Sequence, residues 1–262
     1  MSETSDLVVG TGWVADRLDD PDTRVVDVRD AWEYDGIGHV PRAVNVPFDA
    51  FRTEEGAEGK MPPRAEWTAL LSEAGVETDT HLVGYDDTHG VFAARFLVTA
   101  LYHGHPIDRL HLLDGDYSRW TREHESTGET PEFASTDYDP DPPESTPFVG
   151  ADAVADAVDG DAVVVDTREP VEYEEGHIPG AVNVDWKDLV DDDTRGIRPE
   201  GDVRELLESK GIDSERPVVL YCNTARRISH TYVVLRWLGY EDVFFYEGSL
   251  TEWRDLGRPV EA

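Results

Sequence analysis

Cys222 is the only cysteine in the 262-residue chain, and its surroundings suit a reactive thiol. It follows the apolar run 217–221 and precedes a loop that contains Arg226 and Arg227. A thiol reacts as its thiolate, which neighbouring arginines and the N–H groups at the start of a helix stabilise. The same groups would bind an anionic substrate. The sequence therefore predicts a nucleophilic thiolate beside a bound oxyanion, with a buried structural cysteine as the alternative.

A strand that ends at Tyr221 and a helix that follows the loop would hold this thiol in place. Apolar, β-branched runs recur through the C-terminal half of the chain, at residues 162–165, 181–184, 218–221 and 243–246. Segments 202–211 and 228–238 have helical spacing, and Gly239 can end the second helix. This alternation predicts an α/β fold in which helices flank a parallel sheet. Ligands then bind at the carboxyl ends of the strands, where Cys222 lies.

The N-terminal half of the chain repeats this pattern. Residues 25–47 align with residues 164–185, and residues 114–120 align with residues 247–253. The matched pairs include Asp27/Asp166, Arg29/Arg168, Glu33/Glu172, Tyr34/Tyr173 and His39/His177. Segment 129–145 is rich in proline, acidic and small polar residues, which is typical of an extended linker. We therefore expect two domains, 5–128 and 146–262, joined by a linker at 129–145.

The two copies differ at the position of the thiol. Asp86 aligns with Cys222, and the loop 86–90 contains two acidic residues and no arginine. The first domain therefore lacks a nucleophile, and we expect the second domain to be the catalytic one. Asp166, Arg168 and His177 have counterparts in the copy without the thiol, so we expect them to support the loop rather than to react.

The acidic composition indicates an environment rather than a partner. The chain has 57 acidic residues against 23 lysines and arginines, a formal net charge of −34. Charge repulsion is largely screened in about 1 M salt, so this composition predicts a halophilic source. The charge argues against nucleic acids and anionic membranes as partners, and no long apolar segment interrupts the sequence, which predicts a cytoplasmic protein. His103 and His105 lack further ligands at zinc spacing, and we expect neither a metal nor a cofactor.

The motifs together resemble those of the tandem rhodanese sulfurtransferases over nearly the whole chain. Each half has Asp-x-Arg followed by Gly-His-x-Pro-x-Ala-x-Asn, and the later strand of the second half ends in Tyr221-Cys222. The chain also closes with Glu247-Gly248, Trp253 and the run 257–260, as family members do. The resemblance implies two rhodanese-like domains, of which the first is catalytically silent and the second forms a persulfide on Cys222.

The resemblance implies a sulfurtransferase that moves sulfane sulfur from a small anionic donor, thiosulfate first, to cyanide or a thiol. A thioredoxin-like protein is one candidate acceptor. The alternatives are 3-mercaptopyruvate as the donor, or a non-catalytic rhodanese-like module that carries sulfur or binds partners. A phosphatase of the related fold would need an arginine six residues after the cysteine, where this chain has Ile228.

The loop after the cysteine would bind the donor. Its residues are Asn223, Thr224, Ala225, Arg226 and Arg227. Ala225 stands where family loops usually carry glycine, and Glu172 stands where many two-domain members carry a substrate-binding arginine. We expect Arg226 and Arg227 to supply the positive charge that Glu172 does not.

Overall fold

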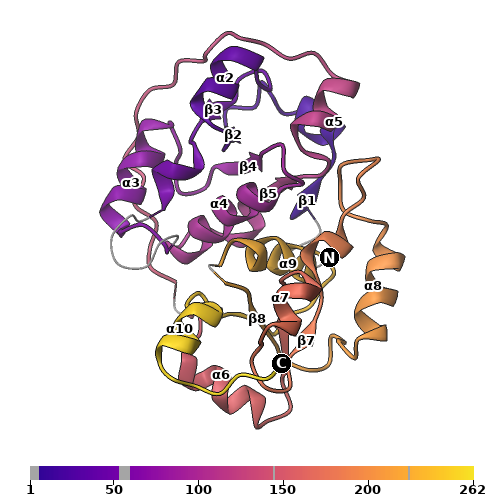
Figure 1. Ribbon diagram of the computed structural model, residues 1–262. Coiled ribbons are helices and arrows are strands. Elements are labelled where there is room, and N and C mark those ends of the chain that lie inside the picture. Colours follow the sequence, from indigo (N-terminus) through magenta and orange to yellow (C-terminus); the bar gives the residue numbers. More distant parts are fainter. Residues whose placement is uncertain (1–5, 53–59, 144, 224) are drawn as a thin grey trace. The chain divides into compact units, whose positions relative to one another are not determined.

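The computed structural model describes residues 6–52, 60–143, 145–223 and 225–262 (Figure 1). The chain divides into two compact units. Unit 1 comprises Met1–Glu144 with Asp192–Gly196, and unit 2 comprises Ser145–Asp191 with Ile197–Ala262. Within the described ranges, no helix is long and apolar enough to cross a membrane.

Unit 1 is a parallel sheet flanked by helices. Its strands are β1 (Val8–Val9), β2 (Thr23–Asp27), β3 (Val44–Asn45), β4 (His81–Tyr85) and β5 (Leu110–Leu113), in the spatial order β1-β5-β4-β2-β3. All of these strand pairs are parallel. The helices are α1 (Thr11–Ala15), α2 (Ala31–Ile37), α3 (Arg64–Glu73), α4 (Val91–Tyr102) and α5 (Asp116–Glu123), with the short 3-10 helices η1 (Phe48–Phe51) and η2 (Ile107–Arg109).

Unit 2 repeats this architecture with one strand fewer among the described residues. Its strands are β6 (Val163–Asp166), β7 (Val182–Asn183), β8 (Val218–Tyr221) and β9 (Val243–Phe245), in the order β7-β6-β8-β9 and again all parallel. The helices are α6 (Ala151–Val158), α7 (Pro170–Glu174), α8 (Glu200–Ser209), α9 (Arg226–Trp237) and α10 (Ser249–Asp255), with the 3-10 helix η3 (Trp186–Leu189). The predicted α/β class and the strands predicted in this half are confirmed.

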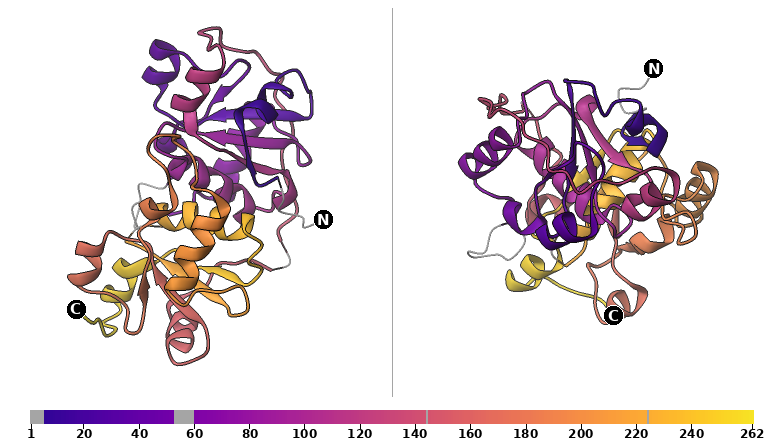
Figure 2. Two further views of the ribbon diagram at one scale, coloured as in Figure 1. Left: turned by 90° about the vertical axis from the view of Figure 1, so that its right-hand side faces the viewer. Right: turned by 90° about the horizontal axis from the view of Figure 1, so that it is seen from above.

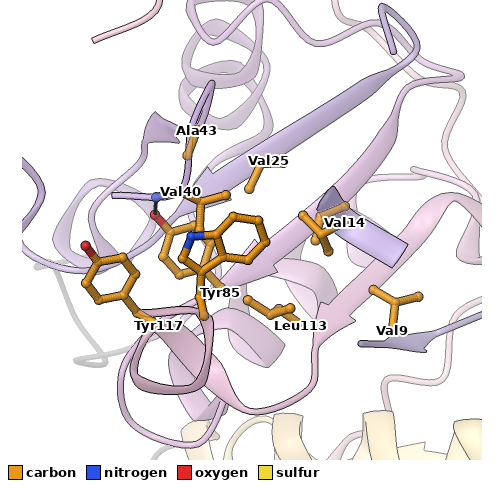
Figure 3. Packing of buried hydrophobic residues seen from close by; sticks show 10 residues of the cluster. Val9, Val14, Val25, Val40, Ala43, Tyr85, Leu113 and Tyr117 are labelled. Atoms are coloured by element: carbon orange, nitrogen blue, oxygen red, sulfur yellow. Dashed lines mark hydrogen bonds between the residues drawn. The ribbon is translucent and has the colours of Figure 1, made fainter. Parts of the chain in front are cut away.

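Each sheet buries both of its faces, which explains why the strands are predominantly apolar. In β4, Val83 and Tyr85 join a cluster with Val14 of α1 and Trp120 of α5 (Figure 3). The opposite face meets α4, since a Cβ atom on Gly84 would lie 3.5 Å from Ala93. Helices lie on both faces of the unit 1 sheet in the views of Figure 2. Unit 2 has the corresponding cluster around Val219 and Tyr221.

The strand order of unit 2 places the loop that follows β8 and begins with Cys222 at the point where the order of the strands reverses. From β6 the chain passes to β7 on one side and then to β8 on the other, so β6 and β8 flank the point where the strand order reverses. Open parallel sheets bind ligands at the carboxyl ends of such strands. The register pairs Asp166 with Tyr221 at these ends, so Cys222 emerges beside the Asp-x-Arg segment.

Residues of the predicted linker lie along unit 1. Tyr138 is buried and its hydroxyl contacts His105 Nδ1 at 3.2 Å, while the Arg24 guanidinium stacks on the Phe133 ring at 3.4 Å. Proline and polar residues keep this segment from joining the sheet, yet its few aromatic side chains still find apolar partners. The domain limits 5–128 and 146–262 remain a prediction.

Candidate active site

The Cys222 thiol lies in a turn between β8 and α9 and is 2% exposed. Its Sγ accepts a hydrogen bond from the Ala225 N–H at 3.1 Å. The Cys222 N–H donates to the Ser249 Oγ at 3.2 Å, and the Cys222 carbonyl accepts from the Leu250 N–H at 2.9 Å. The backbone around the thiol is therefore held from both sides, by α9 and by the start of α10. Thr224 lies outside the described residues.

Ala225 immediately precedes α9 and has a left-handed backbone, with φ 69° and ψ −4°. Gly90 precedes α4 in unit 1 with nearly the same conformation, φ 82° and ψ 9°. L-amino acids with a Cβ atom adopt this conformation only at a cost, whereas glycine adopts it freely. This gives the physical reason why glycine would be the expected residue at position 225. The conformation turns the Ala225 N–H toward the sulfur.

The equivalent loop of unit 1 already holds an anion. The Asp86 carboxylate accepts N–H groups from Thr88 and Gly90 at 2.8 Å each, from Phe92 at 2.7 Å and from Ala93 at 3.0 Å. Burial nevertheless raises the pKa of Asp86 to about 6. The turn before the helix is thus a nest of converging donors that accommodates a negatively charged group.

The nest has counterparts in unit 2, although the loop is one residue shorter. α4 begins five residues after Asp86, and α9 begins four residues after Cys222. When the helix starts are superposed in sequence, Gly90, Phe92 and Ala93 correspond to Ala225, Arg227 and Ile228. The N–H groups in the first turn of a helix have no intrahelical acceptor. In α9 the corresponding N–H groups are those of Arg227 and Ile228.

The Asp-x-Arg segment supports the loop from the neighbouring strand. The Arg168 guanidinium forms a buried ion pair with Asp166 at 2.6 Å and donates to the Gly176 carbonyl at 2.8 Å. It also reaches the Asn223 Oδ1 at 3.4 Å. Arg29 and Asp27 make the same pair and the same type of carbonyl contact in unit 1. The same ion pair occurs in both units, and in unit 2 it contacts Asn223, the residue next to the thiol.

Glu172 also contacts the loop, through a pairing with Arg227 that the sequence did not predict. Its Oε1 accepts from the Asn223 Nδ2 at 2.7 Å, and its Oε2 forms an ion pair with Arg227. Burial alone would raise the pKa of Glu172, but the hydrogen bond and the charge of Arg227 outweigh burial and hold it below its ordinary value. The charge of Arg227 is therefore compensated within the protein. Arg226, the other arginine expected at the site, is exposed.

His177 has the same surroundings as its counterpart in unit 1. Its ring stacks on Tyr173 with 3.7 Å between the ring centres, and its Nδ1 lies 3.0 Å from the Tyr173 carbonyl oxygen. His39 stacks on Tyr34 at 3.8 Å in the same way. Stacking in both units fits a role in packing the segment that follows the Asp-x-Arg motif.

Ser249 is a site residue that the sequence reasoning missed. Its hydroxyl donates to the Tyr246 carbonyl at 2.9 Å while it accepts the Cys222 N–H, and its Oγ lies 4.0 Å from Sγ. The sequence signal was the alignment of Ser249 with Asp116 in the repeat. In the structure both residues have φ 51°. A strained position that differs only in side chain between the two copies marks the surroundings of the thiol.

Among the described residues, no group of three or more His, Cys, Asp or Glu side chains is placed to hold a metal ion. The loop itself presents a thiol that accepts a backbone N–H, beside the ion pair of Glu172 and Arg227.

Comparison with known proteins identifies relatives along nearly the whole chain. A protein from the halophile Haloferax volcanii is 31% identical, covering 98% of this chain and 96% of the relative. The thiosulfate sulfurtransferase of Pseudomonas aeruginosa is 34% identical, and the sulfur carrier protein TtuD of Thermus thermophilus is 31% identical. Each of these two matches covers 97% of this chain and 96% of the relative.

Solved structures share the fold. SseA from Escherichia coli, described as a 3-mercaptopyruvate sulfotransferase, has a TM-score of 0.77 and 25% identity, over 93% of this chain and 98% of that chain. EanB in complex with ergothioneine has a TM-score of 0.87 at 20% identity, over 99% of this chain and 71% of EanB. The rhodanese-like domain family matches residues 11–123 and again residues 150–256. The chain therefore belongs to the rhodanese-like domain family and contains two copies of that domain.

Proposed function

We propose that the protein is a sulfurtransferase in which Cys222 carries sulfur as a persulfide. Thiosulfate is the first candidate donor, and cyanide or a thiol, such as that of a thioredoxin-like protein, is the acceptor. The observation that carries this proposal is the position of the thiol, which receives the Ala225 N–H in a turn whose copy in unit 1 binds the Asp86 carboxylate. The name of the Pseudomonas aeruginosa relative supports the reaction class.

The reaction divides into two displacements. The Cys222 thiolate attacks the outer sulfur of thiosulfate, a sulfur–sulfur bond forms on the enzyme, and the bond to the central sulfur breaks. Sulfite leaves with the electron pair of that bond, so the step needs neither an oxidant nor a proton. An acceptor thiolate or cyanide then attacks the outer sulfur of the persulfide, and the Cys222 thiolate leaves.

The surrounding residues would act through charge and position. The N–H groups of Ala225, Arg227 and Ile228 would stabilise the thiolate and the terminal sulfur of the persulfide, because preorganised backbone donors favour developing negative charge. Asp166 and Arg168 would act as positioning residues, since Arg168 reaches the loop through Asn223. We assign His177 a packing role beside Tyr173.

A carrier without turnover is the second candidate. The relative from Thermus thermophilus is named a sulfur carrier protein, and a carrier would form the same persulfide and deliver it to a dedicated protein. The two candidates differ in turnover with small acceptors. We also retain 3-mercaptopyruvate as an alternative donor.

Intact mass measurement in concentrated salt tests the persulfide directly. After incubation with thiosulfate the wild-type protein should gain about 32 Da, the mass of one sulfur atom, and Cys222→Ala should gain nothing. A wild-type protein that stays unmodified with both thiosulfate and 3-mercaptopyruvate, or a gain that persists in Cys222→Ala, would falsify the proposal. Steady-state turnover with cyanide and with a dithiol then separates the enzyme from the carrier.

A further inference from the structure

We propose that Glu172 is a specificity-determining residue that makes the site discriminate against a second negative charge on the sulfur donor. Its carboxylate holds Arg227 and lies beside the loop, so Glu172 weakens the binding of the thiosulfate dianion more than that of a monoanionic sulfane donor, such as a thiosulfonate. This inference rests on the sulfur transfer proposed above and specifies its substrate class.

The Glu172 carboxylate lies beside the loop that follows Cys222. Glu172 projects from α7 and binds the side chain of Asn223, the residue that directly follows the thiol. Its other oxygen binds Arg227 in the first turn of α9. The glutamate therefore bridges both ends of the loop that turns around Cys222. A donor in this loop would lie close to its negative charge.

Two ion pairs balance the charges of the side chains around the loop. Arg168 is paired with Asp166, and Arg227 is paired with Glu172. These four side chains together carry no net charge. Donor binding then depends on backbone N–H groups, which supply partial charges, and on Arg226, the exposed arginine of the loop. A dianion that used Arg227 would have to displace Glu172 and would leave the glutamate without its ion pair.

Comparison with Glu33 in unit 1 separates the charge role of Glu172 from helix capping. Glu33, the counterpart in unit 1, caps its helix as Glu172 does, because each side chain accepts the backbone N–H of the helix-capping residue at 3.1 Å and 3.2 Å respectively. Near Glu33, however, stands Asp87 in place of Asn223, and burial and the charge of Asp87 raise the pKa of Glu33. Helix capping is thus common to both units, whereas the contact with a loop arginine occurs in the unit that has the thiol.

The charge effect is large enough to measure. At a separation of about 6 Å and an effective dielectric constant of about 40, one unit charge changes the binding of another by about tenfold. A dianion experiences this repulsion twice and a monoanion once. Removing the charge of Glu172 should therefore favour the dianion over the monoanion by about threefold to tenfold, with a smaller effect at higher salt.

Glu172→Gln removes the charge and one of the two acceptor oxygens. The remaining oxygen can accept either the Asn223 Nδ2 or the Glu169 N–H of the capping box, which bind different oxygens of Glu172. Thiosulfate and methanethiosulfonate are the matched probes, because both present a terminal sulfur on an oxidised sulfur and they differ by one negative charge. The ratio of kcat/KM for thiosulfate to that for methanethiosulfonate should rise about threefold to tenfold in this variant. The change should be in KM, with kcat within about twofold of wild type.

Glu33→Gln is the matched control, since it makes the same change in unit 1 and should leave the ratio unchanged. Binding of the two probes to Cys222→Ser, with and without Glu172→Gln, is measured separately by calorimetry and does not require any reaction. An unchanged ratio of the two dissociation constants would overturn the role of Glu172, even if the persulfide forms. A changed ratio without any persulfide on the wild-type protein would instead uphold the charge selection and refute the proposed sulfur transfer.

Discussion

Ala225 precedes α9 in unit 2, and Gly90 precedes α4 in unit 1. Exchanging alanine for glycine at the first position, and glycine for alanine at the second, should shift stability in opposite directions. Ala225 has φ 69° and Gly90 has φ 82°, both in the left-handed region. Ala225→Gly should stabilise unit 2, and Gly90→Ala should destabilise unit 1. The two positions belong to the same turn in two copies of one domain, so each variant is a control for the other.

The expected magnitudes follow from the backbone. A left-handed conformation costs an L-residue about 1–2 kcal/mol, and glycine loses about 0.5–1 kcal/mol more backbone entropy than alanine on folding. Ala225→Gly should therefore raise the free energy of unfolding by about 0.5–1 kcal/mol. Gly90→Ala should lower it by a similar or larger amount, about 1–2 kcal/mol, because the new Cβ atom would also lie 3.0 Å from the Leu112 Cδ1.

Unfolding in guanidinium, monitored by hydrogen exchange, gives the stability of each unit separately while the ionic strength stays high. The midpoint of unit 2 should rise in Ala225→Gly and that of unit 1 should fall in Gly90→Ala, with unchanged slopes. Persulfide formation should persist in Ala225→Gly, because glycine retains the N–H that donates to Sγ. A destabilised Ala225→Gly protein, or a Gly90→Ala protein with wild-type stability, would refute the reasoning about the turn.

Two further predictions concern the buried ionisable groups. Burial lowers the pKa of His105 and of His111 to about 4, below about 6.5 in the unfolded chain, so stability is full above pH 6.5 and declines as the pH falls toward 4. Asp86, with a raised pKa of about 6, offsets part of this decline. Unit 1 should lose about 2 kcal/mol between pH 7 and pH 5 in denaturant titrations, and His105→Gln should remove most of this loss; a flat profile would contradict the assignment. Asp166→Asn should lower the free energy of unfolding of unit 2 by about 3–5 kcal/mol, because Arg168 stays buried without its partner. Asp27→Asn should destabilise unit 1 but leave the persulfide yield per folded protein unchanged.

The architecture could be predicted because it depends on local patterns that the chain states twice. Apolar β-branched runs predicted the strands β6, β7, β8 and β9 to within about two residues at each end. The helix predicted at 228–238 begins two residues earlier, at Arg226, because Ala225 serves as its N-cap. Gly239 follows the helix with φ 86°, as predicted for a glycine that ends a helix. The duplication also made Asp86 an internal comparison for Cys222.

The electrostatic partners at the site could not be predicted in this way. Glu172 and Arg227 are 55 residues apart in sequence, and their pairing depends on how α7 and α9 meet at the ends of β6 and β8. The sequence reasoning assigned Arg227 to the donor because it counted charges within one loop. A charge on another element, brought within hydrogen-bond distance by the sheet, pairs with this arginine, and its contact with the donor remains a prediction.

The sequence by itself determined the repeat, the parallel α/β units and the strand that delivers Cys222 to its turn, because periodicity, strand composition and the internal alignment are local properties of the chain. Only the tertiary structure decided how the thiol is surrounded. It placed Ser249 behind the Cys222 N–H and turned the Ala225 N–H toward Sγ. These contacts join segments far apart in sequence, and hydrogen-bond geometry and charge compensation exist only once the sheet has brought those segments together.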